Sequence, residues 1–417
     1  MENPFAYERP ARSQIFSGRK EIVRSLLSRA RTGQSTALVG EPKMGKTSTL
    51  KFLADVRLKE GYGDEGSRNF VVDIDAHLLG YDCQEDAFWA YLCRRCKGVI
   101  PSEMLRRLEG ACTSGLAYDL EEFFLNLGEK GKRIVLLIDE FDSLLFYPGL
   151  ASGNLFCALR ILSSSTHGLA LVTSSRMNVI AMNRRGEELR KGGSPLFNYL
   201  DEQRLPPFSV DDISSLVDNA LRDSAISLSD DEIVYLGEMS GGLPYLVQLM
   251  AWTLFEAHTK REPKNFSPLK NLLTISSPYF DEIWSHRSLP EQQALTLLAL
   301  EYKGGYIGRT HFRMPDFRLI EEHAPQLRVL QKLGLVKLSQ GAGTNRWEIG
   351  SILFCEWLAL ALENRTKMDK IDSFLSDRKQ GVVLTIGQWK RLWTRLKSIP
   401  FKGLYEVCKN IPKFWLH

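Results

Sequence analysis

The sequence predicts an α/β fold, in which a parallel sheet is sandwiched by helices and is followed by smaller, mainly helical domains. Three observations predict it. Short apolar runs alternate with helical patterns over about the first 200 residues. A glycine-rich loop joins the first of these runs to a helix, and near residue 340 two strand-like runs flank a loop that contains glycine. A chain of 417 residues also exceeds one ordinary core, so several domains are expected.

The composition is that of an ordinary folded protein. Apolar residues make up 44% and charged residues 25%, which disfavours disordered, collagen-like and disulfide-scaffold classes. No window approaches the ~20 apolar residues of a membrane span, so we expect no span and a cytoplasmic protein. Seven scattered cysteines indicate buried thiols in a reducing compartment rather than a disulfide framework.

The first apolar run, residues 36–40, reads as a buried strand, and the loop after it matches the pattern G-x-x-x-x-G-K-[ST]. In such a P-loop, backbone N–H groups and the following helix N-terminus surround phosphates. Lys46 would reach the β- and γ-phosphates, and Thr47 would place its hydroxyl on Mg²⁺. The nucleotide-binding residues expected here are Gly40, Glu41, Pro42, Lys43, Met44, Gly45, Lys46, Thr47 and Ser48.

A second apolar strand, residues 133–139, ends in two carboxylates and reads as a Walker B element. Asp139 would hold Mg²⁺ through water, and Glu140 would orient the attacking water. We expect Asp142 to be a surface or capping residue.

The remaining elements of the first domain follow the same alternation. We expect strands at residues 69–75 and 168–174, with helices at 84–97, 117–129 and near 151–164. Ligands of parallel sheets bind at the carboxyl ends of the strands, where both phosphate-handling segments lie.

Several further segments resemble a known family. Asn3-Pro-Phe5 and Phe16-Ser-Gly-Arg19 look like an N-terminal strip, and Thr173-Ser-Ser-Arg176 looks like a sensor turn. Residues 194–197 and 204–209 look like a last strand leading into a helical lid, and Gly242-Leu-Pro244 matches a GxP motif. With the two phosphate-handling segments, residues 3–360 resemble the STAND branch of the AAA+-like ATPases, including compact bacterial and archaeal ATPases.

The resemblance implies roles for four more residues. Phe16 and Arg19 would lie against the adenine, Arg176 would read the γ-phosphate, and Pro244 would touch the nucleotide from the lid. It also implies ATP or ADP with Mg²⁺ as ligands. The domains expected are 1–207 for the P-loop domain, 208–285 for the helical lid, 286–363 for a winged-helix domain and 364–417 for a basic aromatic tail.

The winged-helix prediction rests on a helix at 288–301, a second at 325–333 and strands at 335–338 and 346–349. Winged helices bind DNA in many proteins, but the family resemblance implies packing against the nucleotide domain instead. Arg328 and Lys332 on the second helix, with Lys337 and Arg346 on the wing, are sparse for phosphate binding. We therefore favour packing.

The C-terminal tail is basic: residues 365–417 carry 12 Lys and Arg against 4 Asp and Glu. Trp389, Leu392, Trp393 and Leu396 would share one helical face. Such a helix would dock on the core, bind an acidic partner such as nucleic acid, or lie at a membrane surface.

Cys93-Arg-Arg-Cys96 is a C-x-x-C pair, but no second pair stands at the spacing of a zinc site. Cys83 and Cys112 are near in sequence, which leaves a metal cluster open. We expect thiols buried in helices.

Three functions follow as hypotheses. The first is a slow ATP hydrolase that acts as a STAND-type switch, with self-assembly or a separate effector or sensor protein as partner. Defence against phage or signalling enters only through the resemblance. The second is a DNA-binding ATPase similar to origin-recognition initiators, using the winged helix and the tail. The third is a nucleotide-binding scaffold without turnover.

Overall fold

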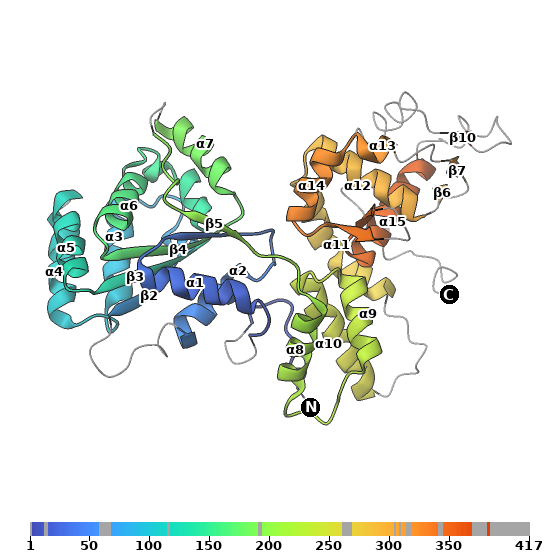
Figure 1. Ribbon diagram of the computed structural model, residues 1–417, viewed down its shortest axis with the longest axis horizontal. Helices are drawn as coiled ribbons and strands as arrows, with labels where there is room; N and C mark the ends of the chain where they lie inside the picture. Colours follow the sequence, from blue (N-terminus) through green and yellow to red (C-terminus); the bar gives the residue numbers. More distant parts are fainter. Residues whose placement is uncertain are drawn as a thin grey trace. The chain divides into compact units, whose positions relative to one another are not determined.

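The computed structural model describes residues 2–11, 16–57, 68–114, 117–190, 194–260, 269–303, 306–307, 310–313, 318–340, 345–368 and 382–383. The helix predicted around residues 389–396 lies outside them. The described residues fall into two compact units (Figure 1). The nucleotide unit spans residues 9–205, and the helical unit holds residues 2–8 and those from 206 onward.

A five-stranded parallel sheet forms the centre of the nucleotide unit, as predicted. Its strands follow the order β2-β3-β4-β1-β5. Their bounds are β1 (Thr36–Val39), β2 (Asn69–Asp75), β3 (Arg133–Asp139), β4 (Leu169–Ser175) and β5 (Asp201–Arg204). Val39 pairs with Ser175, and Asp75 pairs with Asp139. The carboxyl ends of the inner strands therefore meet at one edge, where a ligand of such a sheet binds.

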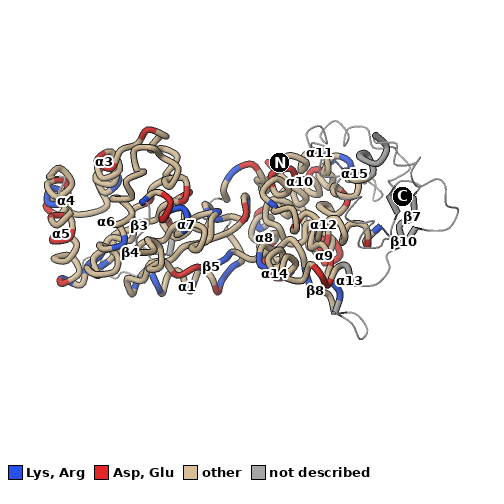
Figure 2. Tube along the Cα trace, turned by 90° about the horizontal axis from the view of Figure 1, so that it is seen from above, with Lys and Arg blue, Asp and Glu red and all other residues tan. Residues whose placement is uncertain are grey.

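Helices cover both faces of this sheet because the strand residues are apolar on both sides. Along β3, Ile134, Leu136 and Ile138 pack into one large core, and Val135 and Leu137 are buried on the opposite face. The large core includes residues of α3, α5 and α6, whereas α1 and α2 pack on the other face. Figure 2 shows α1 and α3 on opposite sides of the strands.

The helical elements of the nucleotide unit match the predicted helices and add others. The bounds are α1 (Lys20–Thr32), α2 (Lys46–Phe52), η2 (Leu53–Arg57), η3 (Ala76–Leu79), α3 (Glu85–Cys96), α4 (Ser102–Ser114), α5 (Ala117–Glu129), η4 (Phe141–Phe146), η5 (Pro148–Leu150), α6 (Asn154–Ser165) and α7 (Val179–Arg190). The sequence did not predict α1, α4 or α7.

The first part of the helical unit is α8 (Val210–Leu221), α9 (Asp230–Ser240), α10 (Pro244–Lys260) and α11 (Leu269–Ser285). Capping boxes start two of these helices: Ser209 with Asp212 at α8, and Ser229 with Glu232 at α9. Residues 2–8 join this unit, since Phe5 packs edge-on against Phe255 of α10.

The second part of this unit contains the predicted helices and hairpin. Its elements are α12 (Leu289–Tyr302), β6 (Tyr306–Ile307), β7 (Thr310–Arg313), α13 (Arg318–Glu321), α14 (Ala324–Lys332), β8 (Val336–Gln340), β9 (Asn345–Ile349), α15 (Ile352–Met368) and β10 (Val382–Val383). Strands β8 and β9 pair antiparallel. Trp357 of α15 is fully buried and donates a hydrogen bond to Ser277 Oγ of α11, 3.1 Å away.

A close backbone approach ties the two parts of the helical unit together. A Cβ on Gly241 would lie 2.5 Å from Gly350 C and 2.6 Å from Ser351 N, closer than real Cβ atoms come. Ser351 Oγ also donates to Met239 O at 2.9 Å. The turn before α10 therefore packs directly against the start of α15. Throughout the described ranges, every helix is too short or too polar to cross a membrane.

Candidate nucleotide site

The predicted P-loop connects β1 to α2 at the carboxyl edge of the sheet. Gly45 precedes the first residue of α2 with φ of 89°, and Lys43 has φ of 60°. A Cβ on Gly45 would meet nothing within 4 Å, so the backbone conformation, rather than space, favours glycine there. Pro42 and Met44 are buried, whereas Lys43 is exposed and Thr47 and Ser48 are partly buried.

Lys46 is held inside the loop. Only 5% of the residue is exposed, and its Nζ donates to Gly40 O at 2.8 Å and Glu41 O at 3.1 Å. Burial lowers the pKa of the ammonium, and the Glu140 carboxylate opposes that effect. The loop thus holds a cation in position while an ammonium still has a third hydrogen to donate.

The two Walker B carboxylates lie at the end of β3, next to the end of β4. Ser174 Oγ donates to Asp139 Oδ1 and accepts from the backbone N–H of Glu140 at 3.0 Å. Ser174 is fully buried. One hydroxyl therefore fixes both the Asp139 side chain and the Glu140 backbone, and the sequence reasoning did not assign it this role.

Glu140 has an unusual backbone and a perturbed carboxyl. Its φ is 52°, which is uncommon for a residue with a Cβ and is found at strained functional positions. Burial raises the pKa of Glu140, while the Lys46 ammonium lowers it. Arg176 Nε lies 4.0 Å from Glu140 Oε2, so Lys46, Glu140 and Arg176 occupy one neighbourhood.

Asp142 was expected to be a surface or capping residue; it is buried, so the surface alternative is wrong, and its carboxylate caps backbone N–H groups. Asp142 is 7% exposed, and its Oδ2 accepts from the backbone N–H groups of Arg176 at 3.1 Å and Met177 at 3.0 Å. The carboxylate replaces the hydration of two N–H groups in the turn after β4. Asp142 therefore fixes the backbone of the turn that carries Arg176.

The second part of the N-terminal strip, Phe16-Ser-Gly-Arg19, lies against the P-loop and α2, whereas Asn3-Pro-Phe5 packs within the helical unit. Arg19 is buried, and its Nη2 donates to Met44 O at 2.7 Å. Phe16 stacks on Phe52, with ring centroids 4.3 Å apart, and Ser48 Oγ accepts from Ala11 N at 3.0 Å. Residues 16–19 of the strip are thus attached to the loop and to α2.

Pro244 belongs to the helical unit, where it is the first residue of α10. Gly241 and Gly242 precede it with φ of 62° and 71°. Gly242 O accepts from Phe208 N at 2.7 Å, which joins this turn to the start of the lid. The contacts of the GxP residues described here lie within their own unit.

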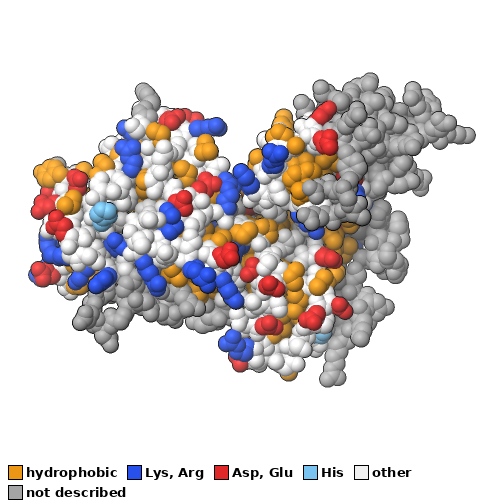
Figure 3. Space-filling view, in the orientation of Figure 1, with side chains coloured by type: hydrophobic (Ala, Val, Ile, Leu, Met, Phe, Trp, Pro, Cys, Tyr) orange, Lys and Arg blue, Asp and Glu red, His pale blue; other side chains and the backbone are white. Residues whose placement is uncertain are grey.

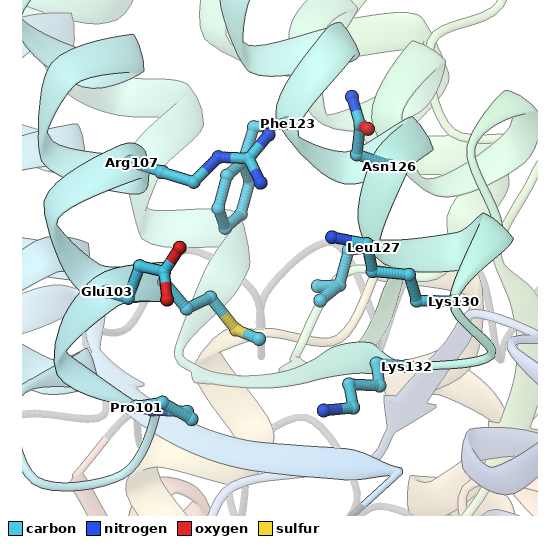
Figure 4. A pocket seen from close by; sticks show the side chains of 9 residues that line it. Pro101, Glu103, Arg107, Phe123, Asn126, Leu127, Lys130 and Lys132 are labelled. Carbon is cyan, nitrogen blue, oxygen red and sulfur yellow. The ribbon is translucent and has the colours of Figure 1, made fainter.

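A separate surface pocket of the nucleotide unit lies away from the P-loop (Figure 4). It has a volume of about 200 Å³ and is lined from α4 and α5 by Glu103, Arg107, Phe123 and others. Lys132, which also lines it, precedes the first residue of β3, whereas Asp139 ends that strand. The pocket is therefore at the opposite edge of the sheet from the carboxylates.

Within the described part of the chain, no group of three or more His, Cys, Asp or Glu side chains is arranged to hold a metal ion. The predicted Mg²⁺ ligands, Thr47 and Asp139, are one hydroxyl and one carboxylate. These are hard oxygen donors, and Mg²⁺ bound with a nucleotide takes few protein ligands and keeps several waters. The donor set therefore fits a cation that is completed by phosphate and water.

The fold and this site define the class, a P-loop ATPase fold. Residues 29–175 match the AAA domain family, and that range contains both the P-loop and Asp139 with Glu140. The sequence has no match among curated proteins.

The chain is similar to several solved structures, and the first of those named below shares its fold. The Walker-type ATPase of Pyrococcus abyssi is 17% identical with a TM-score of 0.53, over 84% of this chain and 98% of that one. The ORC2 protein of Aeropyrum pernix, in ADPNP–ADP complexes, is 16% identical with a TM-score of 0.47, over 84% and 93%. The RuvB Holliday junction branch migration motor of Thermotoga maritima is 13% identical with a TM-score of 0.37, over 80% and 94%.

Proposed function

We propose that the protein binds and slowly hydrolyses ATP and uses the nucleotide state as a conformational switch of the STAND type. The observation that carries the proposal is the grouping of a buried Lys46 with Asp139 and Glu140 at one edge of the sheet, with Ser174 fixing the two acidic residues. Phosphoryl transfer depends mainly on positioning and charge neutralisation, and this grouping supplies both.

Each residue then has a distinct part. The P-loop N–H groups and the remaining hydrogen of Lys46 bind the phosphates, and the two loop carbonyls keep its Nζ in place. Glu140 orients a water for attack, and Arg176, 4.0 Å from it, senses the γ-phosphate. Mg²⁺, held by Thr47 and through water by Asp139, would neutralise charge on the phosphates.

The proposed switch depends on contacts with the γ-phosphate that form in one conformation of the protein and not in the other. A ligand shifts a conformational equilibrium only by its difference in affinity for the two states. We infer that Arg176 and Glu140, which lie beside each other, make contacts with ATP that ADP lacks, and that Asp142 couples the Arg176 turn to the segment after β3. The partner under this proposal is a second copy of the chain or a separate effector protein.

Lys46→Ala tests the nucleotide site. We expect ATP affinity to fall by at least about 100-fold, because the cation inside the loop is lost. The matched control is Lys51→Ala, which removes an exposed lysine from the same helix. Isothermal calorimetry measures both, and wild-type affinity in Lys46→Ala would show that the site is assigned wrongly.

Glu140→Gln tests hydrolysis and switching together. We expect turnover to fall by about 100-fold with ATP still bound, and the trapped protein to change its assembly state in ATP but not in ADP. Light scattering after size-exclusion chromatography measures the assembly. An unchanged mass in both nucleotides, with and without duplex DNA, would contradict a self-assembling switch.

The DNA-binding alternative is tested in the same experiment by the arm with duplex DNA. Of the wing residues that it needs, Arg346 is engaged with Glu301 of α12 at 3.0 Å. The described face in Figure 3 also carries Lys and Arg interspersed with Asp and Glu. The Arg346–Glu301 contact engages one of the few wing cations that DNA binding would use, which counts against the DNA-binding alternative. A shift in mass only with DNA would favour that alternative instead.

A further inference from the structure

Two cysteines from neighbouring helices of the nucleotide unit lie in contact. Cys93 of α3 and Cys112 of α4 are joined by a hydrogen bond between their thiols, with the sulfurs 3.3 Å apart. The helices are consecutive in the chain and pack on each other. The contact therefore links the two helices through a pair of reactive groups.

The two thiols differ in exposure and in pKa. Cys93 is 7% exposed and Cys112 is partly exposed, so the pair lies just below the surface. The hydrogen bond that the two thiols share lowers the pKa of Cys93 and raises that of Cys112. Cys93 is thus the thiol that ionises first, and its partner retains the proton. Thiolate character and access are what make a cysteine reactive.

The third cysteine nearby, Cys96, is a poorer candidate. It is fully buried one turn along α3, and burial raises its pKa to about 12. Within the described residues these cysteines also form no group arranged for a metal ion. The pair across the two helices is therefore the reactive combination.

We propose that Cys93 and Cys112 are a modification site for peroxides, at which oxidation forms a reversible disulfide between α3 and α4. The Cys93 thiolate attacks one peroxide oxygen, the O–O bond breaks, and a sulfenic acid and one water result. The Cys112 sulfur then attacks the Cys93 sulfur, the S–O bond breaks, and a second water leaves. Two thiols lose two electrons and two protons, and hydrogen peroxide is reduced to two waters.

The site needs little movement to react. A disulfide requires sulfurs about 2 Å apart, so from their separation of 3.3 Å the two sulfurs need to approach by a little over 1 Å. Bridging residues 93 and 112 closes a loop of about 20 residues, which restricts the unfolded chain. The oxidised protein should therefore be more stable, with the position of α4 on α3 fixed covalently.

The test is disulfide mapping of the full chain. The wild type is treated with hydrogen peroxide, its remaining thiols are alkylated, and it is digested and analysed by mass spectrometry without reduction. We expect a peptide pair joined through Cys93 and Cys112, released by dithiothreitol. A link from Cys93 to Cys96, or Cys93 oxidised to sulfinic acid with no link, would overturn the proposal. This measurement needs no variant and does not depend on ATP hydrolysis.

Variants sharpen the result. Oxidation of the wild type should remove two titratable thiols, and Cys112→Ser should abolish that loss. Cys157→Ser replaces a partly buried cysteine of α6 in the same unit and should leave the loss unchanged. The reverse pattern would contradict the assignment. Oxidation of the wild type should raise the Tm by roughly 5 °C. A Tm that stays level or falls would show that the bond does not form in the native packing.

Discussion

Ser174 connects the two residues on which the proposed chemistry depends. Its hydroxyl donates to the Asp139 carboxylate and accepts from the Glu140 N–H, and no water can replace it in so buried a position. A serine at the end of a strand thus controls where the proposed Mg²⁺ ligand Asp139 points and where the next backbone amide lies. Groups behind the ligands commonly decide how well a metal site works.

We expect Ser174→Ala to lower ATP turnover by about 10- to 100-fold, because Asp139 loses its orienting donor. ATP affinity should change by less, since Lys46 and the P-loop are untouched. Steady-state kinetics and calorimetry separate the two effects. The control is Thr173→Val in the same strand, whose buried hydroxyl has no hydrogen-bond partner among the described residues. Equal losses in both variants would mean that the strand, and not the hydroxyl, matters.

The Glu140 carboxyl makes stability depend on pH. Burial raises its pKa in the folded protein, so the ionised form costs stability above that pKa, and the cost disappears as pH falls through it. Glu140→Gln removes the charge, and we expect a Tm higher than wild type at pH 8 by on the order of 1–3 °C. The difference should shrink at pH 4. Thermal melts at both pH values measure this difference in Tm, and Glu187→Gln, at an exposed position, is the control.

The sequence located the residues whose chemistry has a fixed spacing. Lys46 follows from the loop pattern, and Asp139 with Glu140 follows from an apolar strand that ends in acids. Ser174 and Asp142 could not be assigned in this way, because their roles depend on contacts across about 35 residues of chain. Those contacts exist only once β3 and β4 pair.

At the scale of elements, the turn before α10 is the most constrained segment of the helical unit. Gly242 has φ of 71°, and a Cβ there would lie 2.3 Å from Phe208 O. Both the backbone conformation and the space exclude a side chain. The residues of the GxP match therefore have a structural task in joining the lid helices, in addition to any contact with nucleotide.

Gly242→Ala should destabilise the protein by about 2–4 kcal/mol, because the strain of the positive φ adds to the clash with the backbone. The control, Gly237→Ala in the middle of α9, meets only ordinary contacts at 3.6 Å and should stabilise by about 0.5–1 kcal/mol. Urea unfolding followed by circular dichroism measures both. If Gly242→Ala left the free energy of unfolding unchanged, the close approach of residue 242 to Phe208 O would be contradicted.

Strands β1 to β4 were predicted well because they are short, apolar and bounded by turn residues. The last strand was misplaced: β5 is polar and lies mainly between the two segments, 194–197 and 204–209, at which it was expected. Helix α4 was missed because most of its surface is polar, and Leu108 and Ala111 are the buried residues of its 13 positions. Helix α7 has a similar character, with Met182 and Gly186 buried. A pattern that weak indicates a helix only when its neighbours are in place.

At the scale of the whole molecule, binding of the nucleotide should raise the free energy of unfolding. ATP with Mg²⁺ at 100 times its Kd adds about 2.7 kcal/mol to the state that binds it. We expect the Tm of the wild type to rise by roughly 5 °C or more, and that of Lys46→Ala to stay unchanged. Removing Mg²⁺ with EDTA should reduce the shift. A rise of the same size in both proteins would place the nucleotide elsewhere.

The approach of Gly241 to Gly350 also limits how the chain can be divided or recombined. A cut at residue 285 would separate α8–α11 from the helix α15 that packs on them, and each piece would expose a hydrophobic surface that its counterpart now covers. We therefore expect residues 206–285 and 286–363 to be kept together in related proteins. Chimaeras that exchange residues 286–363 alone between relatives should be insoluble, whereas those that exchange everything from residue 206 onward should fold.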